Sequence, residues 1–195
     1  KIFGLLILSL TATGISSAAT LTVDLNGGAD YTNIQSAIDA AKDGDTVLVK
    51  SGEYVITEPI NFNRLHDPNN PDSPPVKNIV VKSEGGAEVT TIRMAETPTN
   101  PDRASVVVFE NGETNASVLN GFGLTGGKGT GDPWNRHGGG VACSEGSSPI
   151  LTKCTISGND ASGSGGGVAC SEGSSPILTK CTISGNGYFG YSPIC

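Results

Sequence analysis

Apolar and polar residues alternate in short runs along most of the chain, and the alternation is clearest between residues 138 and 159. Val141 and Cys143 share one side of a short run there, with Ala142 on the other side. A period of two residues predicts β-strands, because successive side chains of a strand point to opposite faces. In the run that follows, the predicted inward positions are Ile150, Thr152, Cys154 and Ile156. The predicted outward positions are Leu151, Lys153 and Thr155, where the lysine marks the solvent side.

The segment at residues 138–159, GGGVACSEGSSPILTKCTISGN, recurs letter for letter at residues 165–186, at an offset of 27 residues. A segment followed at once by its own copy must be able to pack against that copy, as the coils of a solenoid do. Gly138–Gly140 and Glu145–Pro149 supply the corners, because glycine adopts positive φ and proline cannot donate to a central ladder. We therefore expect coils of a parallel β-helix, stacked about 4.8 Å apart. The expected partners in adjacent coils are Val141 with Val168 and Ile156 with Ile183.

Similar runs with less regular sequences occur upstream. Short β-branched or aromatic runs that end in Gly, Asn or Glu predict strands at residues 21–25, 46–50, 79–82, 105–109 and 118–122. Apolar residues at helical spacing predict an amphipathic helix from Asn33 to Lys42. The residues of this apolar stripe are Ile34, Ala37, Ile38 and Ala41. Because the end of a solenoid exposes unpaired strand edges and apolar core, we expect this helix to cap the first coil.

Two stretches of the chain resemble known β-helix proteins. Residues 30–47, DYTNIQSAIDAAKDGDTV, with Gly52-Glu53-Tyr54, resemble the N-terminal cap of the pectin-lyase-like right-handed parallel β-helix proteins. The later coils resemble β-helix repeat proteins of bacterial surfaces, including the GGA(I)/FxxN repeats of polymorphic outer-membrane proteins. Here Gly-Gly-Gly-Val replaces GGA(I) and Ile-Ser-Gly-Asn replaces FxxN. The resemblance implies an all-β fold, a right-handed parallel β-helix (solenoid) with a short N-terminal capping α-helix.

Composition agrees with a fold of turns and closely packed backbones. Glycine occupies 28 of the 195 positions, which disfavours a helix-rich fold because a glycine inside a helix costs about 1 kcal/mol. The chain is acidic, with 12 Lys and Arg against 19 Asp and Glu and a net charge of −7. It has no cluster of basic residues, so nucleic acid is not expected as a partner.

The chain begins with a basic residue, an apolar run and small polar residues, the order of a secretory signal peptide. The apolar run is about half of the roughly 20 residues that a membrane span needs. We therefore expect a signal peptide at residues 1–19 and a β-helix domain at 20–195, with its N-terminal cap at 20–45 and coils at 46–195. The expected location is secreted or at the cell surface, in the outer membrane if the protein is autotransporter-like. Residues 192–195 restart a strand seen at 148–150, so a C-terminally truncated fragment is expected.

Two functions remain open, because this fold hosts both enzymes and adhesins. One is a non-catalytic adhesion or polysaccharide-binding module, whose partner would be a polysaccharide or another cell-surface component. The other is a polysaccharide lyase or glycoside hydrolase whose catalytic part is degenerate or missing. Resemblance to pectate lyases or polygalacturonases would imply catalytic motifs that do not occur in this sequence. Arg136-His137-Gly138 comes nearest to one of them, but it lacks a glycine before the histidine. Glu145 and Glu172 recur at one corner, where we expect them to stack as solvated turn residues.

An insertion at residues 128–137 interrupts the repeat and is the candidate ligand-binding loop. It contains the only tryptophan and one of the two histidines. An aromatic ring beside cations and an imidazole suits stacking on a carbohydrate and hydrogen bonding to it, and loops are where function concentrates. The alternative interpretation is that the insertion is a longer corner whose tryptophan packs on its own coil. The candidate residues are Lys128, Trp134, Arg136 and His137.

A second irregular loop, from His66 to Pro75, is rich in proline and is expected to be a rigid surface excursion. Asp67, Asn69 and Asp72 offer oxygen ligands there, so calcium is the one cofactor for which the sequence supplies candidate ligands.

Four cysteines and two asparagines recur at the 27-residue offset. If Cys143 stacks on Cys170 and Cys154 on Cys181, the Cα separation of about 4.8 Å permits disulfides. Buried free thiols that pack as small apolar groups are the equal alternative. Asn159 and Asn186 are expected to form a structural asparagine ladder.

Overall fold

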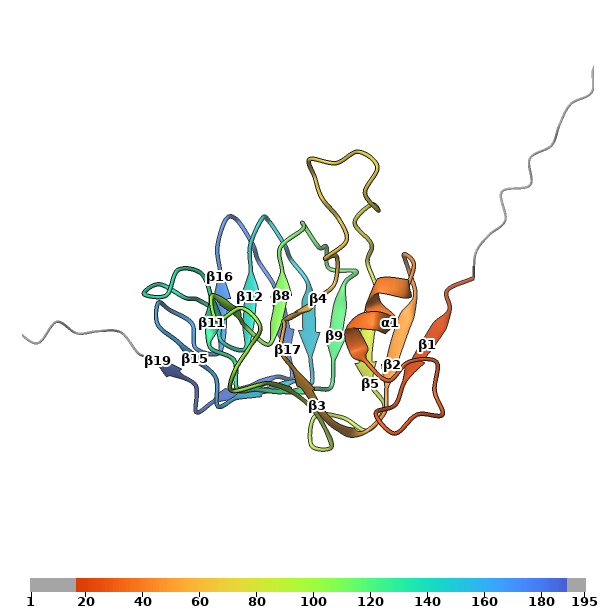
Figure 1. Ribbon diagram of the computed structural model, residues 1–195, viewed down its shortest axis with the longest axis horizontal. Coiled ribbons are helices and arrows are strands. Elements are labelled where there is room, and N and C mark those ends of the chain that lie inside the picture. Colours follow the sequence, from red (N-terminus) through yellow and green to blue (C-terminus); the bar gives the residue numbers. More distant parts are fainter. Residues whose placement is uncertain (1–16, 189–195) are drawn as a thin grey trace, which may run out of the picture.

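The strands that the repeat predicts stack coil upon coil in a computed structural model that describes residues 17–188 (Figure 1). Val141 is the parallel partner of Val168, and Ile156 is the parallel partner of Ile183. Both pairings confirm the register expected from the 27-residue offset. The fold is the predicted all-β parallel β-helix.

Three parallel sheets form the sides of the stack. In spatial order, the first sheet consists of β1 (Thr20–Val23), β2 (Thr46–Val49), β5 (Val80–Ser83), β9 (Val118–Asn120), β13 (Ile150–Thr152) and β17 (Ile177–Thr179). The second consists of β3 (Gly52–Ile56), β6 (Thr90–Met94), β10 (Gly123–Thr125), β14 (Thr155–Ser157) and β18 (Thr182–Ser184). The third consists of β4 (Ile60–Asn61), β8 (Val107–Phe109), β12 (Val141–Cys143) and β16 (Val168–Cys170). A short parallel pair, β15 (Asp160–Ala161) and β19 (Gly187–Tyr188), joins the last two coils.

The predicted capping helix is present as α1 (Ile34–Ala40), which packs against β1, β2 and β4. Asn33 caps its N-terminus, and its Oδ1 accepts a hydrogen bond from the Ser36 backbone N–H at 3.0 Å. The predicted apolar stripe is buried. The helix ends two residues before Lys42, because Ala41 has extended backbone angles (φ −64°, ψ 147°). No helix within residues 17–188 is long and apolar enough to cross a membrane.

The core is a column of stacked apolar side chains enclosed by the three sheets. The Phe62 and Phe109 rings lie 4.7 Å apart at their centroids. Gly139 allows the backbone to pass close by at a corner, since a Cβ there would lie 2.3 Å from the Asp160 carbonyl oxygen. The largest fully buried side chains are Phe62, Phe109, Phe122, Ile38, Ile60, Ile79, Ile92, Met94, Leu119, Leu124, Leu151 and Ile156.

The predicted alternation over residues 150–156 is partly wrong. Leu151 points inward and is fully buried, whereas the flanking Ile150 and Thr152 are only partly buried. Lys153 has φ 53°, a left-handed conformation that ends β13 and turns the chain into the next sheet. The turn shifts the alternation by one residue, so Cys154 is inward as predicted but belongs to the following segment.

Two loops leave the regular stack. Residues 66–75 project from its side (Figure 1). The insertion folds back so that β11 (Gly129–Thr130) pairs antiparallel with β7 (Arg103–Ala104), with Thr130 opposite Arg103. This pair connects the insertion to the strand that carries Arg103.

Candidate binding groove

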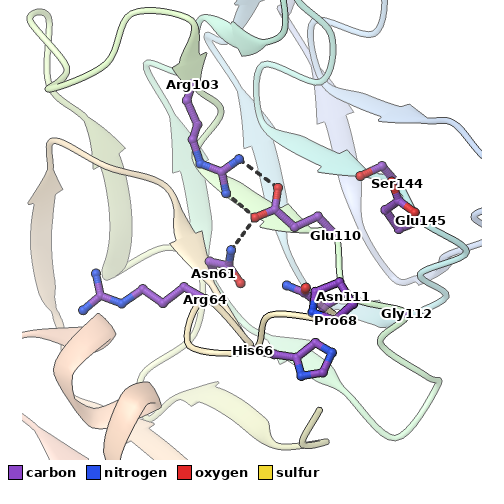
Figure 2. A pocket seen from close by; sticks show the side chains of 10 residues that line it. All are labelled: Asn61, Arg64, His66, Pro68, Arg103, Glu110, Asn111, Gly112, Ser144 and Glu145. Carbon is purple, nitrogen blue, oxygen red and sulfur yellow. Dashed lines mark hydrogen bonds and ion pairs between the residues drawn. The ribbon is translucent and has the colours of Figure 1, made fainter. Parts of the chain in front are cut away.

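An open groove of about 750 Å³ lies beside the third sheet, where residues from successive coils meet (Figure 2). Because β4, β8 and β12 are in register, the residues at or after their carboxyl ends are placed next to one another. Glu110 follows β8 and Ser144 follows β12, and the Ser144 backbone N–H donates to the Phe109 carbonyl at 2.8 Å. The lining residues are Asn61, Arg64, His66, Pro68, Arg103, Glu110, Asn111, Gly112, Ser144 and Glu145.

An ion pair reinforced by an amide forms one wall of the groove. Arg103 Nη1 donates to Glu110 Oε2 at 2.8 Å, and its Nη2 donates to Oε1. Asn61 Nδ2 donates to the same Oε1 at 2.6 Å (Figure 2). The hydrogen bond to Glu110 raises the pKa of the Arg103 guanidinium. These three polar groups are therefore held in one fixed arrangement before any ligand binds.

Arg64 and His66 also line the groove. Arg64 Nε donates to both oxygens of Asp39 at 3.0 Å, and this hydrogen bonding raises the pKa of the guanidinium. Figure 2 shows the Arg64 side chain directed away from the Glu110 pair. His66 Nδ1 lies 2.9 Å from the Pro74 carbonyl oxygen, and a carbonyl only accepts. Nδ1 therefore carries a proton, and in the neutral ring Nε2 is an acceptor.

A buried carboxylate holds the turn at Asn111, a residue that lines the groove. Glu113 is 1% exposed. Its Oε1 accepts from Asn63 Nδ2 at 3.0 Å, and its Oε2 accepts from the Asn111 backbone N–H at 3.0 Å and from Ser147 Oγ at 2.8 Å. These bonds connect three coils, so the turn that carries Asn111 has a defined position.

The insertion brings its four predicted ligand residues onto one loop, but both of its cations are already paired. Arg136 Nη2 lies 2.7 Å from Asp102 Oδ1, and Lys128 Nζ lies 3.2 Å from Asp160 Oδ2. Trp134 is 76% exposed. The tryptophan residue is therefore largely exposed, whereas the positive charges of the loop are paired with acidic groups.

His137 connects the insertion to the next coil. Its Nδ1 lies 2.8 Å from Ser164 Oγ and accepts a hydrogen bond from the Ser164 backbone N–H at 3.1 Å. Asp102 and Arg103 are consecutive, and they bind Arg136 of the insertion and Glu110 of the groove respectively. The insertion and the groove are thus attached to the same short segment.

The calcium candidates belong to a loop whose side chains form hydrogen bonds with the loop's own backbone. Asp67 Oδ1 accepts from the Asn69 backbone N–H at 2.9 Å, and the Asp72 backbone N–H donates to Asn70 Oδ1 at 3.1 Å. Within residues 17–188, no group of three or more His, Cys, Asp or Glu side chains could hold a metal ion.

The four repeated cysteines are free thiols in the structure. Cys143 is the parallel partner of Cys170. Burial raises the pKa of the Cys143 thiol. The neighbouring Cys181 thiol, together with burial, raises the pKa of the Cys154 thiol, whereas the Cys154 thiol lowers the pKa of the more exposed Cys181.

Asn159 and Asn186 occupy equivalent positions in adjacent coils. Asn159 Nδ2 donates to Asn186 Oδ1 at 3.0 Å, and Asn159 Oδ1 accepts from the Gly127 backbone N–H at 2.9 Å. Asn159 is completely buried. The two amides therefore link three consecutive coils and have a structural role.

The repeated glutamates also contact each other along the stack. Glu172 Oε2 accepts from the Glu145 backbone N–H at 3.2 Å. Both residues have left-handed backbone angles, with φ 53° and 51°. Glu145 lines the groove, whereas Glu172 lies on the neighbouring coil.

Sequence reasoning missed most of the groove. It singled out Glu145 because this residue recurs, but it did not identify Asn61, Arg103 and Glu110. These three residues lie in coils whose sequences differ from the repeat. The available signal was weak: Arg103 and Glu110 flank the predicted strand at 105–109, and only the coil geometry brings them together.

One family model matches the chain. Residues 102–193 match the model described as the right handed beta helix region. The match includes the insertion and both copies of the 22-residue repeat. No curated protein matches the chain.

Proposed function

We propose that this right-handed parallel β-helix repeat protein is an exported, cell-surface or extracellular module that binds polysaccharide without cleaving it. The observation that carries the proposal is the groove, where side chains from successive coils present amides, a hydroxyl and paired charges. Its volume of about 750 Å³ is within the range of ligand sites.

The chemistry of the groove is suited to sugar hydroxyls. Asn111, Ser144 and the His66 imidazole offer donors and acceptors close to a rigid Arg103–Glu110 pair. Exposed Trp134, on the loop attached to the same β7 segment, offers a face for stacking on a sugar ring. A solenoid flank also suits an extended chain, since successive coils repeat at about 4.8 Å.

A lyase or hydrolase remains the second candidate, because two carboxylates, Glu110 and Glu145, line one groove. Glycoside hydrolysis needs a carboxyl pair in which one member protonates the leaving group. Both oxygens of Glu110 already accept hydrogen bonds from Arg103 and Asn61, which engages this carboxyl group within the protein and so opposes that role.

Binding and cleavage are separated by two measurements on the purified protein. Calorimetric titration with a panel of oligosaccharides tests binding, and incubation with pectate and calcium, followed through the absorbance of the unsaturated product, tests β-elimination. The proposal expects binding without product. Product formation above background would overturn the non-catalytic reading.

Two variants locate the binding site. Trp134→Ala and Asn111→Ala are each expected to weaken oligosaccharide binding by about fivefold or more, equivalent to about 1 kcal/mol. Asn120→Ala, on the outer face of β9, is the matched control. If all three variants bind the oligosaccharide as tightly as the wild type, any binding site must lie elsewhere.

A further inference from the structure

We infer that the groove takes uncharged glycans and discriminates against uronate-rich ones. This inference rests on the proposed polysaccharide-binding function and specifies the ligand class of the same site.

Both guanidinium groups at the groove are already engaged. Arg103 makes two hydrogen bonds to Glu110, and Arg64 makes a forked contact with Asp39. Arg64 also lies 3.8 Å from Glu58. A ligand carboxylate would have to compete with a protein carboxylate for either cation, and a displaced protein carboxylate would lose its partner.

The insertion offers no further cation. Arg136 pairs with Asp102, and Lys128 pairs with Asp160. Every lysine or arginine that either lines the groove or belongs to the predicted ligand loop is therefore paired with an acidic side chain.

The charge without a cationic partner is negative. Among the described residues, Glu145 lines the groove and forms no ion pair, and Glu172 lies next to it on the following coil. The whole chain carries a net charge of −7. A polyuronate would thus bring repeated negative charge toward an acidic rim, which opposes binding.

The groove also offers uncharged polar groups that are only partly used within the protein. Within residues 17–188, the Ser144 hydroxyl makes no hydrogen bond, and Asn111 uses only its Nδ2, which donates to the Asn63 carbonyl at 3.3 Å. The Ser144 hydroxyl and the Asn111 amide oxygen match sugar hydroxyls, which both donate and accept. This complementarity needs no charge on the ligand.

The test compares ligands that differ only at C6. The probes are a methyl-esterified oligogalacturonate with its de-esterified form, and cellohexaose with its C6-oxidised form, titrated calorimetrically in EDTA and again with calcium. The uncharged member of at least one pair is expected to bind at least about tenfold more tightly. Equal or tighter binding of the acidic member, with or without calcium, would overturn the inference and leave the proposed function intact. Failure of all four probes to bind would count against the proposed function itself.

Charge-removing variants test the cause of the discrimination. Glu110→Gln releases Arg103, and Glu145→Gln removes the unpaired charge, so each is expected to strengthen binding of the acidic probe by about threefold or more. Glu88→Gln, an exposed residue outside the groove, makes the same charge change and serves as the control. Thermal unfolding checks that each variant is folded. An equal gain in all three variants would show that only net charge matters and would contradict the inference.

Discussion

Lys153 shows how one residue determines the course of a coil. It has φ 53° at the corner between β13 and β14. The equivalent residue of the preceding coil is Gly121, with φ 80°, since Asn120 and Thr152 are register partners. Replacing the lysine by glycine removes the cost of a Cβ in the left-handed region, which exceeds the entropy cost of glycine.

Lys153→Gly is therefore expected to stabilise the protein by about 0.5–1 kcal/mol. Urea denaturation followed by circular dichroism measures the change. Lys82→Gly, on the outer face of β5, is the control and should be destabilising. A loss of stability in Lys153→Gly would contradict the assigned corner.

A second residue-scale prediction concerns Asn159. Its truncation leaves the buried Gly127 N–H and Leu124 carbonyl without their side-chain partners. Asn159→Ala should therefore lower the free energy of unfolding by about 2–3 kcal/mol, whereas Asn120→Ala should change it by less than about 0.5 kcal/mol. If urea denaturation shows the same loss of stability for both variants, the structural role assigned to the asparagine ladder is wrong.

The sequence predicted elements more reliably than the faces of single residues. The repeat specified the register of β12 with β16 and of β14 with β18, because identical segments must present identical surfaces. Apolar spacing likewise identified α1. The assignment of Leu151 failed because the left-handed turn at Lys153 has no signature in hydrophobicity. The groove was missed because Arg103 and Glu110 meet only through side-chain geometry.

Acid should destabilise the N-terminal cap by protonating Asp45. Its carboxylate accepts from the backbone N–H of Lys42 at 2.8 Å, and in the uncleaved chain also from that of Ala19 at 2.7 Å, and these bonds lower its pKa below the ordinary value. A lowered native pKa stabilises the fold above the unfolded value, and this contribution is lost as the pH falls through the native pKa. Stability should therefore fall below about pH 4.

Unfolding measured from pH 6 to pH 2 checks this expectation. Asp45→Asn should flatten the acid limb of the stability profile, and Asp132→Asn, on the exposed insertion, should leave it unchanged. An identical profile in wild type and Asp45→Asn would show that other carboxylates control acid unfolding.

At the scale of the whole molecule, the stack is a sum of coils and their interfaces. The two identical copies make this property directly testable, because deletion of residues 138–164 joins His137 to an identical segment beginning at Gly165. The shortened protein should fold with a parallel β-helix spectrum, a smaller denaturant m-value and lower stability. An unfolded product, or an unchanged m-value, would contradict an additive stack.

The central claim is that the groove beside the third sheet binds a glycan, and the most direct test is a nuclear magnetic resonance titration of ¹⁵N-labelled protein with the oligosaccharide that binds best in calorimetry. The account predicts saturable shifts at the side-chain amides of Asn61 and Asn111 and at the backbone amides of Gly112 and Ser144. Asn120, on the outer face of the first sheet, should not shift. Saturable shifts confined to other surfaces, or no shifts at any glycan concentration, would contradict the claim.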